Sequence, residues 1–190
     1  IGGFFSLLTE RVLAPEHWVS GLLNHWKLPP ESQPLIERVL MLCAEHELNI
    51  STFTARCAYS AQSTPYEAFQ AALAALKGQR HGGATELVID FIHHSKDTPL
   101  MPYLSKTLRK EGHLPGFGHP LYPQGDPRWP LFYEELPTEE NTHLDSLLEA
   151  TQSLNCPPPN LDLIWGVLTL RYRLSFSQCM SLFALGRSVG

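Results

Sequence analysis

Three histidines of this 190-residue chain stand in local sequences that favour chemical use of the imidazole ring. His46 lies between two glutamates, His81 directly precedes a pair of glycines, and His119 ends a Pro-Gly-Phe-Gly-His stretch. A neighbouring glycine lets the backbone approach a ligand closely and adopt a positive φ. Histidine also titrates near neutral pH, so each ring could hold or transfer a proton. Each of the three also fits an ordinary surface, core or turn histidine, and the residues alone leave these alternatives open.

Three charged residues complete the candidate set. Asp162 follows Asn160 and Leu161 at the start of a predicted helix, where the helix dipole favours a carboxylate. A capping role therefore explains its position as well as a catalytic role does. Arg128 and Arg187, considered alone, are typical of surface or packing arginines.

Other chemistries find little support in the sequence. The Gly116-Phe117-Gly118 stretch is no dinucleotide loop, because Leu121 stands where a third glycine is needed and no predicted strand precedes it. His93 and His94 would leave a helix in different directions, which makes a shared metal ion improbable. Neither GxSxG nor HExxH occurs. The sequence therefore predicts no metal centre.

Composition narrows the class of protein. Hydrophobic residues make up 43% of the chain and charged residues 17%, which is enough to build a packed core. The formal net charge is -5, and no basic cluster is longer than Arg109-Lys110, so nucleic acid is not an expected partner. No run of about 18 apolar residues predicts a membrane span. The four cysteines lack CxxC spacing, and we expect reduced thiols in a cytoplasmic protein.

The apolar spacing predicts an all-α fold. Helices can begin or be capped at Pro34, at Ser63-Thr64-Pro65, at Asn160 and at Ser175. The proline-rich stretch after Lys96 instead predicts a stiff loop. No convincing alternating stretch argues for a sheet. Helices are expected at 34–47, 53–61, 66–76, from about 82–83 to 94, within 134–149, and at 161–172 and 176–189, with the loop at 114–128.

Four separated segments, in order, resemble signatures of the citrate synthase family. Any one of them would be a moderate signal, and the four together, at similar spacing, are a strong one. They are AEHELNISTFTAR at 44–56, AALKGQRHGGA at 74–84, LPGFGH at 114–119 with GDPR at 125–128, and PNLD at 159–162 with LFALGRSVG at 182–190.

The resemblance implies the all-α citrate synthase fold. Residues 1–84 and 161–190 would belong to the large helical domain and residues 85–160 to the small domain, with the active site in the cleft between them. We expect the N-terminal part of the family and its C-terminal tail to be absent, because the chain starts at Ile1 and stops after an apolar run. The family is dimeric, and the apolar helices around 35–47 and 53–76 are candidates for a homodimer contact.

The resemblance also assigns a role to each matching residue. His46, Arg128 and Arg187 match the residues that hold oxaloacetate. Asp162 matches the base that removes a methyl proton from acetyl-CoA, His81 the partner of the thioester oxygen, and His119 the group that polarises the ketone. No permanently bound cofactor is implied, because acetyl-CoA is a co-substrate. The segment that matches the CoA-binding loop is Leu114, Pro115, Gly116, Phe117 and Gly118.

Two departures keep other functions open. Pro120 and Pro123 stand where the family commonly has basic residues, one of which meets the CoA phosphates. A 2-methylcitrate synthase, which uses propionyl-CoA with the same catalytic set, is one alternative. A non-catalytic relative that binds an acyl-CoA or a di- or tricarboxylate for regulation is the other.

Overall fold

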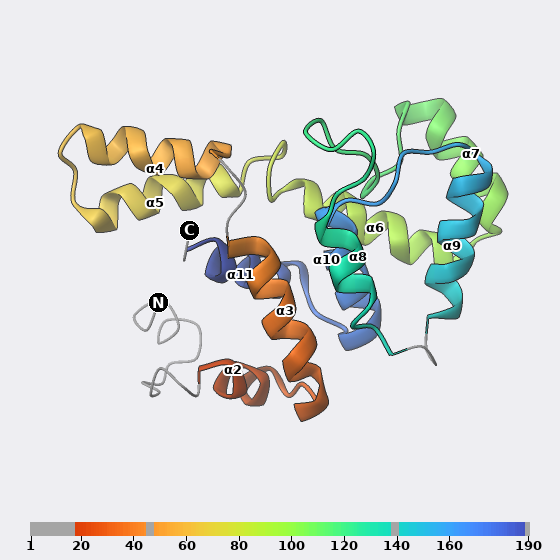
Figure 1. Ribbon diagram of the computed structural model, residues 1–190, viewed down its shortest axis with the longest axis horizontal. Helices are drawn as coiled ribbons and strands as arrows, with labels where there is room; N and C mark the ends of the chain where they lie inside the picture. The colour runs from red at the N-terminus through yellow and green to blue at the C-terminus, as the bar shows by residue number, and fades with distance from the viewer. Residues whose placement is uncertain (1–17, 45–47, 138–140, 189–190) are drawn as a thin grey trace. The chain divides into compact units, whose positions relative to one another are not determined.

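The computed structural model describes residues 18–44, 48–137 and 141–188 of the chain. Within these ranges the regular structure is helical, apart from one isolated bridge between Phe117 and Pro159, which confirms the all-α prediction (Figure 1). The helices are α2 (Trp18–Trp26), the 3-10 turn η2 (Pro30–Ser32), α3 (Gln33–Ala44), α4 (Ile50–Ser60), α5 (Pro65–Leu76), α6 (Ala84–Asp97), α7 (Leu100–Glu111), α8 (Arg128–Tyr133), α9 (Thr142–Ser153), α10 (Leu161–Tyr172) and α11 (Phe176–Arg187).

The chain divides into two compact units. One consists of Ile1–Asn49 with Ser181–Gly190, and the other of Ile50–Met180. These boundaries differ from the expected family domains of 1–84 with 161–190 and of 85–160. Packing within a single chain does not define family domains, so that division stays a prediction.

Several predicted helices begin where local chemistry places them. Thr64 caps α5 in a reciprocal capping box with Glu67. Ser175 and Gln178 make the same pair of bonds at the start of α11. Asn160 caps α10, whose bounds agree with the predicted 161–172. In each case an oxygen-bearing side chain satisfies a backbone N–H that the first helical turn leaves without a partner.

Two helices of the proline-rich stretch were not predicted: α7 lies before the predicted loop at 114–128, and α8 begins at its last residue. Pro102 is the third residue of α7, and Pro130 is the third residue of α8. Proline in a first helical turn removes an N–H that has no intrahelical acceptor, so it begins a helix without breaking one. The helix expected within 134–149 begins later, at Thr142.

The smaller unit is built around one face of α3. Its apolar stripe is buried as the spacing predicted, and it consists of Leu35, Ile36, Val39, Leu40 and Cys43. Gly186 of α11 approaches this stripe closely, because a Cβ atom there would lie 2.8 Å from the carbonyl oxygen of Leu40. The last three residues of the helix predicted at 34–47 lie outside the described residues.

Helix α10 forms the core of the larger unit. Eight of its residues are buried, from Leu161 to Thr169 with the exception of Asp162. Helix α6 packs against it at Gly166, where an added Cβ would lie 2.9 Å from Cγ2 of Ile92. A helix that is apolar all round must be covered on every side, so its N-terminus is held in a fixed place. That N-terminus carries Asp162.

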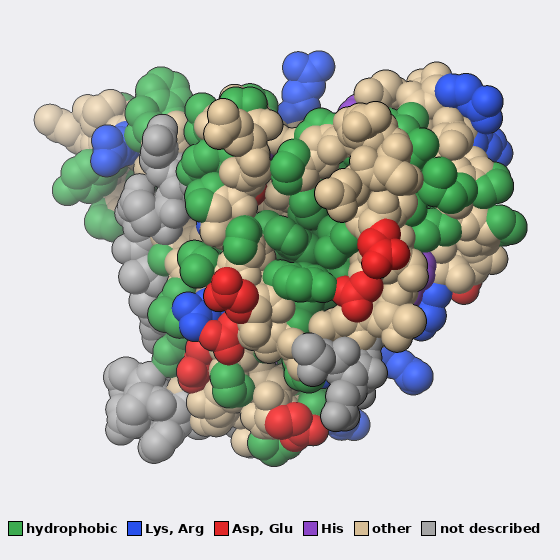
Figure 2. All heavy atoms as spheres, turned by 45° about the vertical axis from the view of Figure 1, so that its right-hand side comes forward, with side chains coloured by type: hydrophobic (Ala, Val, Ile, Leu, Met, Phe, Trp, Pro, Cys, Tyr) green, Lys and Arg blue, Asp and Glu red, His purple; other side chains and the backbone are tan. Residues whose placement is uncertain are grey.

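Charged side chains of both signs are scattered over the described part of the face that Figure 2 draws. Figure 2 shows basic side chains singly or in small groups over the described part of one face. Among the described residues, no helix has both the length and the apolar character that crossing a bilayer requires.

We predict that Gly166→Ala destabilises the protein, although alanine is normally the better helix former. The added methyl group would overlap Ile92 and force α6 away from α10. Overpacking of this kind costs about 1–3 kcal/mol. Chemical denaturation monitored by circular dichroism measures the change. In an Ile92→Ala background, which removes the obstructing methyl group, the same substitution should cost clearly less, and an equal cost in both backgrounds would refute this explanation.

Candidate functional site

The loop that contains His119 is joined to the segment before α10 by backbone hydrogen bonds. The N–H of Gly118 donates to the carbonyl of Pro158 at 2.8 Å, and the N–H of Asn160 donates to the carbonyl of Gly116 at 2.9 Å. The bridge between Phe117 and Pro159 lies between these two bonds. This short antiparallel pairing places His119 beside the first turn of α10.

Glycine is required in this loop for a physical reason. Gly116 has φ +82° and Gly118 has φ +77°, a region that disfavours side chains. A Cβ atom at Gly116 would also lie 3.1 Å from Leu163 of α10. Leu114 and Phe117 are buried. In the predicted CoA-binding segment, Pro115 is therefore the one residue with a partly exposed side chain. The CoA role of 114–118 stays a prediction.

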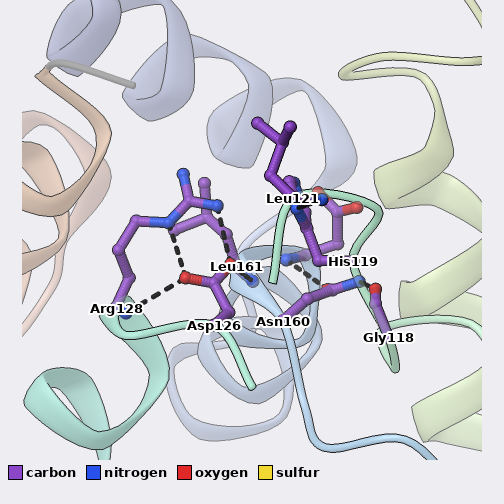
Figure 3. Close-up of polar contacts among 8 residues, drawn as sticks. Gly118, His119, Leu121, Asp126, Arg128, Asn160 and Leu161 are labelled. Carbon is purple, nitrogen blue, oxygen red and sulfur yellow. Dashed lines mark hydrogen bonds and ion pairs between the residues drawn. The ribbon is translucent and has the colours of Figure 1, made fainter. Parts of the chain in front are cut away.

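Asn160 connects the loop to the helix. Its Oδ1 accepts a hydrogen bond from the N–H of Asp162 at 2.9 Å, which caps α10. Its Nδ2 donates to the carbonyl of Gly118 at 2.6 Å. One side chain, only 8% exposed, therefore ties Asp162 to the residue that precedes His119. Figure 3 shows the Asn160 side chain beside Gly118.

Arg128 forms a buried ion pair with Asp126. The guanidinium donates through Nε to Oδ1 at 2.8 Å and through Nη2 to Oδ2 at 2.6 Å. Asp126 is 2% exposed and Arg128 is 8% exposed. Burial raises the pKa of Asp126, but its bonds to Arg128 and to the N–H of Leu161 outweigh that effect, and the pKa lies below the ordinary range. A guanidinium has five N–H donors, so three remain for another partner.

Asp162 is the acid of this region whose pKa moves upward. Burial raises it to about 6, the positive charge of Arg128 opposes the rise, and the negative charge of Asp126 adds to it. The side chain keeps some solvent exposure, so a ligand can still reach it. A carboxyl group with this pKa is ionised at neutral pH and is a stronger base than an ordinary aspartate.

His119 lies in the field of the same ion pair. Burial lowers its pKa, Asp126 opposes the fall, and Arg128 adds to it. The Nδ1 atom accepts a hydrogen bond from the N–H of Leu121 at 3.2 Å, so the neutral ring carries its proton on Nε2. The ring also packs on Tyr122, with 5.0 Å between centroids. His119 is therefore arranged to donate a hydrogen bond while neutral.

The structure thus brings together three of the predicted residues, His119, Arg128 and Asp162, within the larger unit. This group combines a base, a neutral hydrogen-bond donor and a cation that can pair with a carboxylate. Proton removal beside a polarised carbonyl needs such a combination.

The other predicted residues are placed differently. His81 lies in the turn before α6, where its Nε2 is 3.0 Å from Oγ of Ser51. Arg187 belongs to the smaller unit, in the last turn of α11, and its guanidinium lies 5.8 Å from the ring centroid of Phe183. His46 lies outside the described residues. A convergence of all six side chains stays a prediction.

One residue of this region was not predicted as functional. In the sequence, Asp126 stands out only as part of the GDPR segment at 125–128. Its position two residues before an arginine, in an Asp-Pro turn, was the available signal. Among the described residues, no group of three or more side chains could hold a metal ion.

Comparison with known proteins gives consistent matches. The family model for the citrate synthase C-terminal domain matches residues 7–190. Citrate synthase 2 of Bacillus subtilis is 40% identical over 107 residues, which cover 56% of this chain and 29% of that protein. 2-Methylcitrate synthase 1 of Corynebacterium glutamicum is 32% identical over 163 residues, which cover 81% of this chain and 43% of that protein. The chain therefore spans less than half the length of these curated relatives.

Solved structures agree on the fold. Citrate synthase from Thermotoga maritima matches with a TM-score of 0.71 at 30% identity, covering 90% of this chain and 50% of that one. Citrate synthase from Thermoplasma acidophilum, in a ternary complex with carboxymethyl coenzyme A and oxaloacetate, matches with a TM-score of 0.73 at 28% identity. The match covers 94% of this chain and 52% of that one. A citryl-CoA lyase from Hydrogenobacter thermophilus matches with a TM-score of 0.78 at 21% identity, covering 97% of this chain and 75% of that one. At this identity the match shows a shared fold alone.

We predict that Asn160→Ala lowers the free energy of unfolding by about 0.5–2 kcal/mol, the usual effect of losing a helix cap. It also removes the bond to Gly118 that holds the loop. Asn160→Asp is the matched comparison, because it keeps the capping oxygen but sets a carboxylate against the Gly118 carbonyl. Hydrogen exchange should show faster opening of the 114–119 loop in both variants and a frayed first turn of α10 only in the alanine variant. An unchanged loop in Asn160→Asp would mean that this bond does not hold it.

Proposed function

The chain belongs to the citrate synthase family, and on that premise we propose that the full-length protein is an acyltransferase that condenses acetyl-CoA with oxaloacetate to give citrate and CoA. The observation that carries the proposal is the position of Asp162. Its carboxyl group, with a pKa raised to about 6, lies in the field of Arg128, which also acts on the neutral His119.

Each residue has a defined part in the proposed reaction. The carboxylate of Asp162 removes a proton from the carbon next to the thioester, and His81 donates a hydrogen bond to the thioester oxygen as negative charge develops there. The resulting carbon nucleophile attacks the ketone of oxaloacetate, and His119 donates the Nε2 proton to the ketone oxygen. Arg128, together with His46 and Arg187, holds the oxaloacetate carboxylates. Water then hydrolyses the thioester product and releases CoA.

The acyl group separates two candidate activities. The 2-methylcitrate synthase of Corynebacterium glutamicum matches 81% of this chain, a larger share than the 56% matched by the Bacillus subtilis citrate synthase. Propionyl-CoA is therefore the second candidate acyl donor. It adds one methyl group to the carbon that Asp162 would deprotonate, and a single methyl group changes selectivity by about 10–200-fold.

A regulatory, non-catalytic protein is the candidate from another class. Pro120 and Pro123 are exposed and uncharged in the loop that would meet the CoA phosphates. Weaker phosphate binding suits a protein that senses a ligand as well as one that turns it over. The presence of Asp162, His119 and His81 together favours the enzyme.

A homodimer in the cytoplasm is part of the proposal. Within the larger unit, α4 and α5 pack on each other and bury only Ser51, Ala68 and Leu76. Large apolar side chains of this pair face solvent, among them Phe53, Tyr59 and Tyr66, which are 54%, 63% and 68% exposed. Exposed apolar surface of this kind is typical of a protein interface. The cytoplasmic location rests on the four cysteines, which form no disulfide bond in the structure.

We predict that the full-length protein releases CoA thiol from acetyl-CoA in the presence of oxaloacetate. Asp162→Asn should lower kcat by about 10²–10⁴-fold, because Asn160 still caps α10 while an amide at position 162 cannot accept the proton. A thiol-reagent assay with acetyl-CoA and propionyl-CoA in parallel measures the rates, and calorimetry with oxaloacetate measures binding.

The outcomes separate the candidates. Faster release from propionyl-CoA would assign the 2-methylcitrate activity. Binding of both ligands by the unaltered protein without turnover would favour the regulatory candidate. Full activity in Asp162→Asn would mean that another group accepts the proton.

We also predict that Phe53→Glu shifts the full-length protein from dimer to monomer, because it places a charge in the apolar contact. Met101→Glu, at another exposed apolar position in the larger unit, is the matched control and should leave the dimer intact. Sedimentation velocity measures the mass. A monomeric unaltered protein, or an equal effect of both substitutions, would contradict the proposed contact.

A further inference from the structure

A single buried carboxylate holds two parts of the site that are distant in sequence. Asp126 accepts the Nε and Nη2 hydrogen bonds of Arg128 and also its backbone N–H, the last at 3.0 Å. Its Oδ2 accepts a fourth bond, at 3.1 Å, from the N–H of Leu161, which lies 35 residues later at the first position of α10. Figure 3 shows Asp126 between Arg128 and Leu161, with His119 and Asn160 nearby.

We propose that Asp126 is a positioning residue that couples the substrate-binding arginine to the start of the helix that carries the base. The coupling rests on the proposed function for its catalytic meaning, since Arg128 and Asp162 have their roles only within that reaction. In this proposal Asp126 acts through Arg128 and the N–H of Leu161.

The geometry fixes which edge of Arg128 is presented to a ligand. A carboxylate that binds Nε and one Nη2 hydrogen fills one edge of the planar guanidinium. The three remaining N–H donors then point away from Asp126, and any substrate carboxylate must approach on that side. Because Asp126 and Arg128 are both buried, the guanidinium group of Arg128 has one low-energy orientation.

The same carboxylate fixes the first turn of α10. The N–H of Leu161 is one of the donors that the first turn leaves without an intrahelical partner. Bonding it to Asp126 anchors the helix one residue before Asp162. A movement of the Arg128 side chain would therefore displace Asp162, because Asp126 is bonded both to Arg128 and to the first residue of α10.

Charge adds a second connection. Arg128 and Asp126 are the charged groups that act on Asp162, with effects of opposite sign, and both also act on His119. Asp126 thus cancels part of the arginine's field at the base. Without it, Arg128 would act alone and the carboxyl group of Asp162 would ionise at lower pH.

A purely structural ion pair is the competing explanation, and it makes different predictions. Loss of such a pair would lower stability and shift the Asp162 titration through charge alone, but it would not raise the KM for oxaloacetate or make Leu161→Pro slower than Leu161→Ala. The experiment therefore uses the full-length protein with three variants, Asp126→Asn, Asp126→Glu and the control Asp90→Asn, an exposed acid on α6. Carboxyl ¹³C NMR follows the titration of Asp162, whose signal is identified by its loss in Asp162→Asn.

In Asp126→Asn we expect the titration of Asp162 and the acid limb of the kcat/KM profile to move down by about one pH unit. The KM for oxaloacetate should rise at least tenfold, because the guanidinium group of Arg128 loses the charged partner that orients it. Asp126→Glu restores the charge with a longer side chain, so it should keep the acid limb near its original pH while the KM still rises. Asp90→Asn should change neither quantity. An unmoved Asp162 titration in Asp126→Asn, or equal shifts in Asp126→Asn and Asp126→Glu, would overturn the proposal.

A second pair of variants tests the link to α10 if Asp126→Asn does not fold. Leu161→Pro removes the N–H donor at a position where proline suits a helix, and Asn160 already has the extended conformation that proline requires of its predecessor. Leu161→Ala controls for the lost side chain. We expect Leu161→Pro to have a kcat at least tenfold below that of Leu161→Ala and an altered Asp162 titration. Identical values in the two variants would refute the coupling.

The two proposals fail in different ways. If the unaltered protein shows no turnover with either acyl-CoA, the enzymatic function is wrong. The NMR titration still decides whether Asp126 controls Asp162, because it needs no substrate.

Discussion

The buried pair of Asp126 and Arg128 is the interaction on which the arrangement of this region depends. Taking two charges out of water costs several kcal/mol per ion, and only good geometry with further hydrogen bonds offsets that cost. Here the carboxylate receives four N–H donors, and one of them comes from the helix that carries Asp162. Removing either charge would leave the other buried and uncompensated. The same carboxylate therefore fixes the position of the segment with Arg128 and the position of the first turn of α10.

The loop before this pair is ordered by its own backbone. The carbonyl oxygens of Gly116 and Gly118 already accept bonds from Asn160, and the N–H of Gly118 donates to Pro158. A ligand that reached this segment would therefore find several backbone groups in use. If coenzyme A binds here as the family resemblance implies, Pro115 and the remaining backbone groups must supply the contacts. The uncharged Pro120 and Pro123 add no cation for its phosphates.

The sequence predicted what depends on near neighbours. Asn160 as a cap, the bounds of α10 and the buried stripe of α3 follow from residues a few positions apart, and the structure agrees. No helix was predicted where α7 and α8 form, because prolines in a first turn give the same local signal as prolines in a loop. The bond from Asp126 to Leu161 could not be predicted by such reasoning, since it joins residues that only the tertiary fold brings together. The pKa of Asp162 depends on burial, which is equally a tertiary property.

The two aspartates that share Arg128 act on stability in opposite directions. The pKa of Asp126 is lowered in the folded state, so its contribution is present at neutral pH and is lost on acidification. The pKa of Asp162 is raised from 3.8 to about 6, so the folded state binds its proton more tightly than the unfolded chain does. Stability that this proton provides below pH 3.8 is lost as the pH rises through about 6. At neutral pH the protein thus keeps an ionised carboxylate where its surroundings disfavour the charge, and the compensating ion pair lies beside it. A residue that only capped α10 would gain nothing from this environment, whereas a base gains proton affinity.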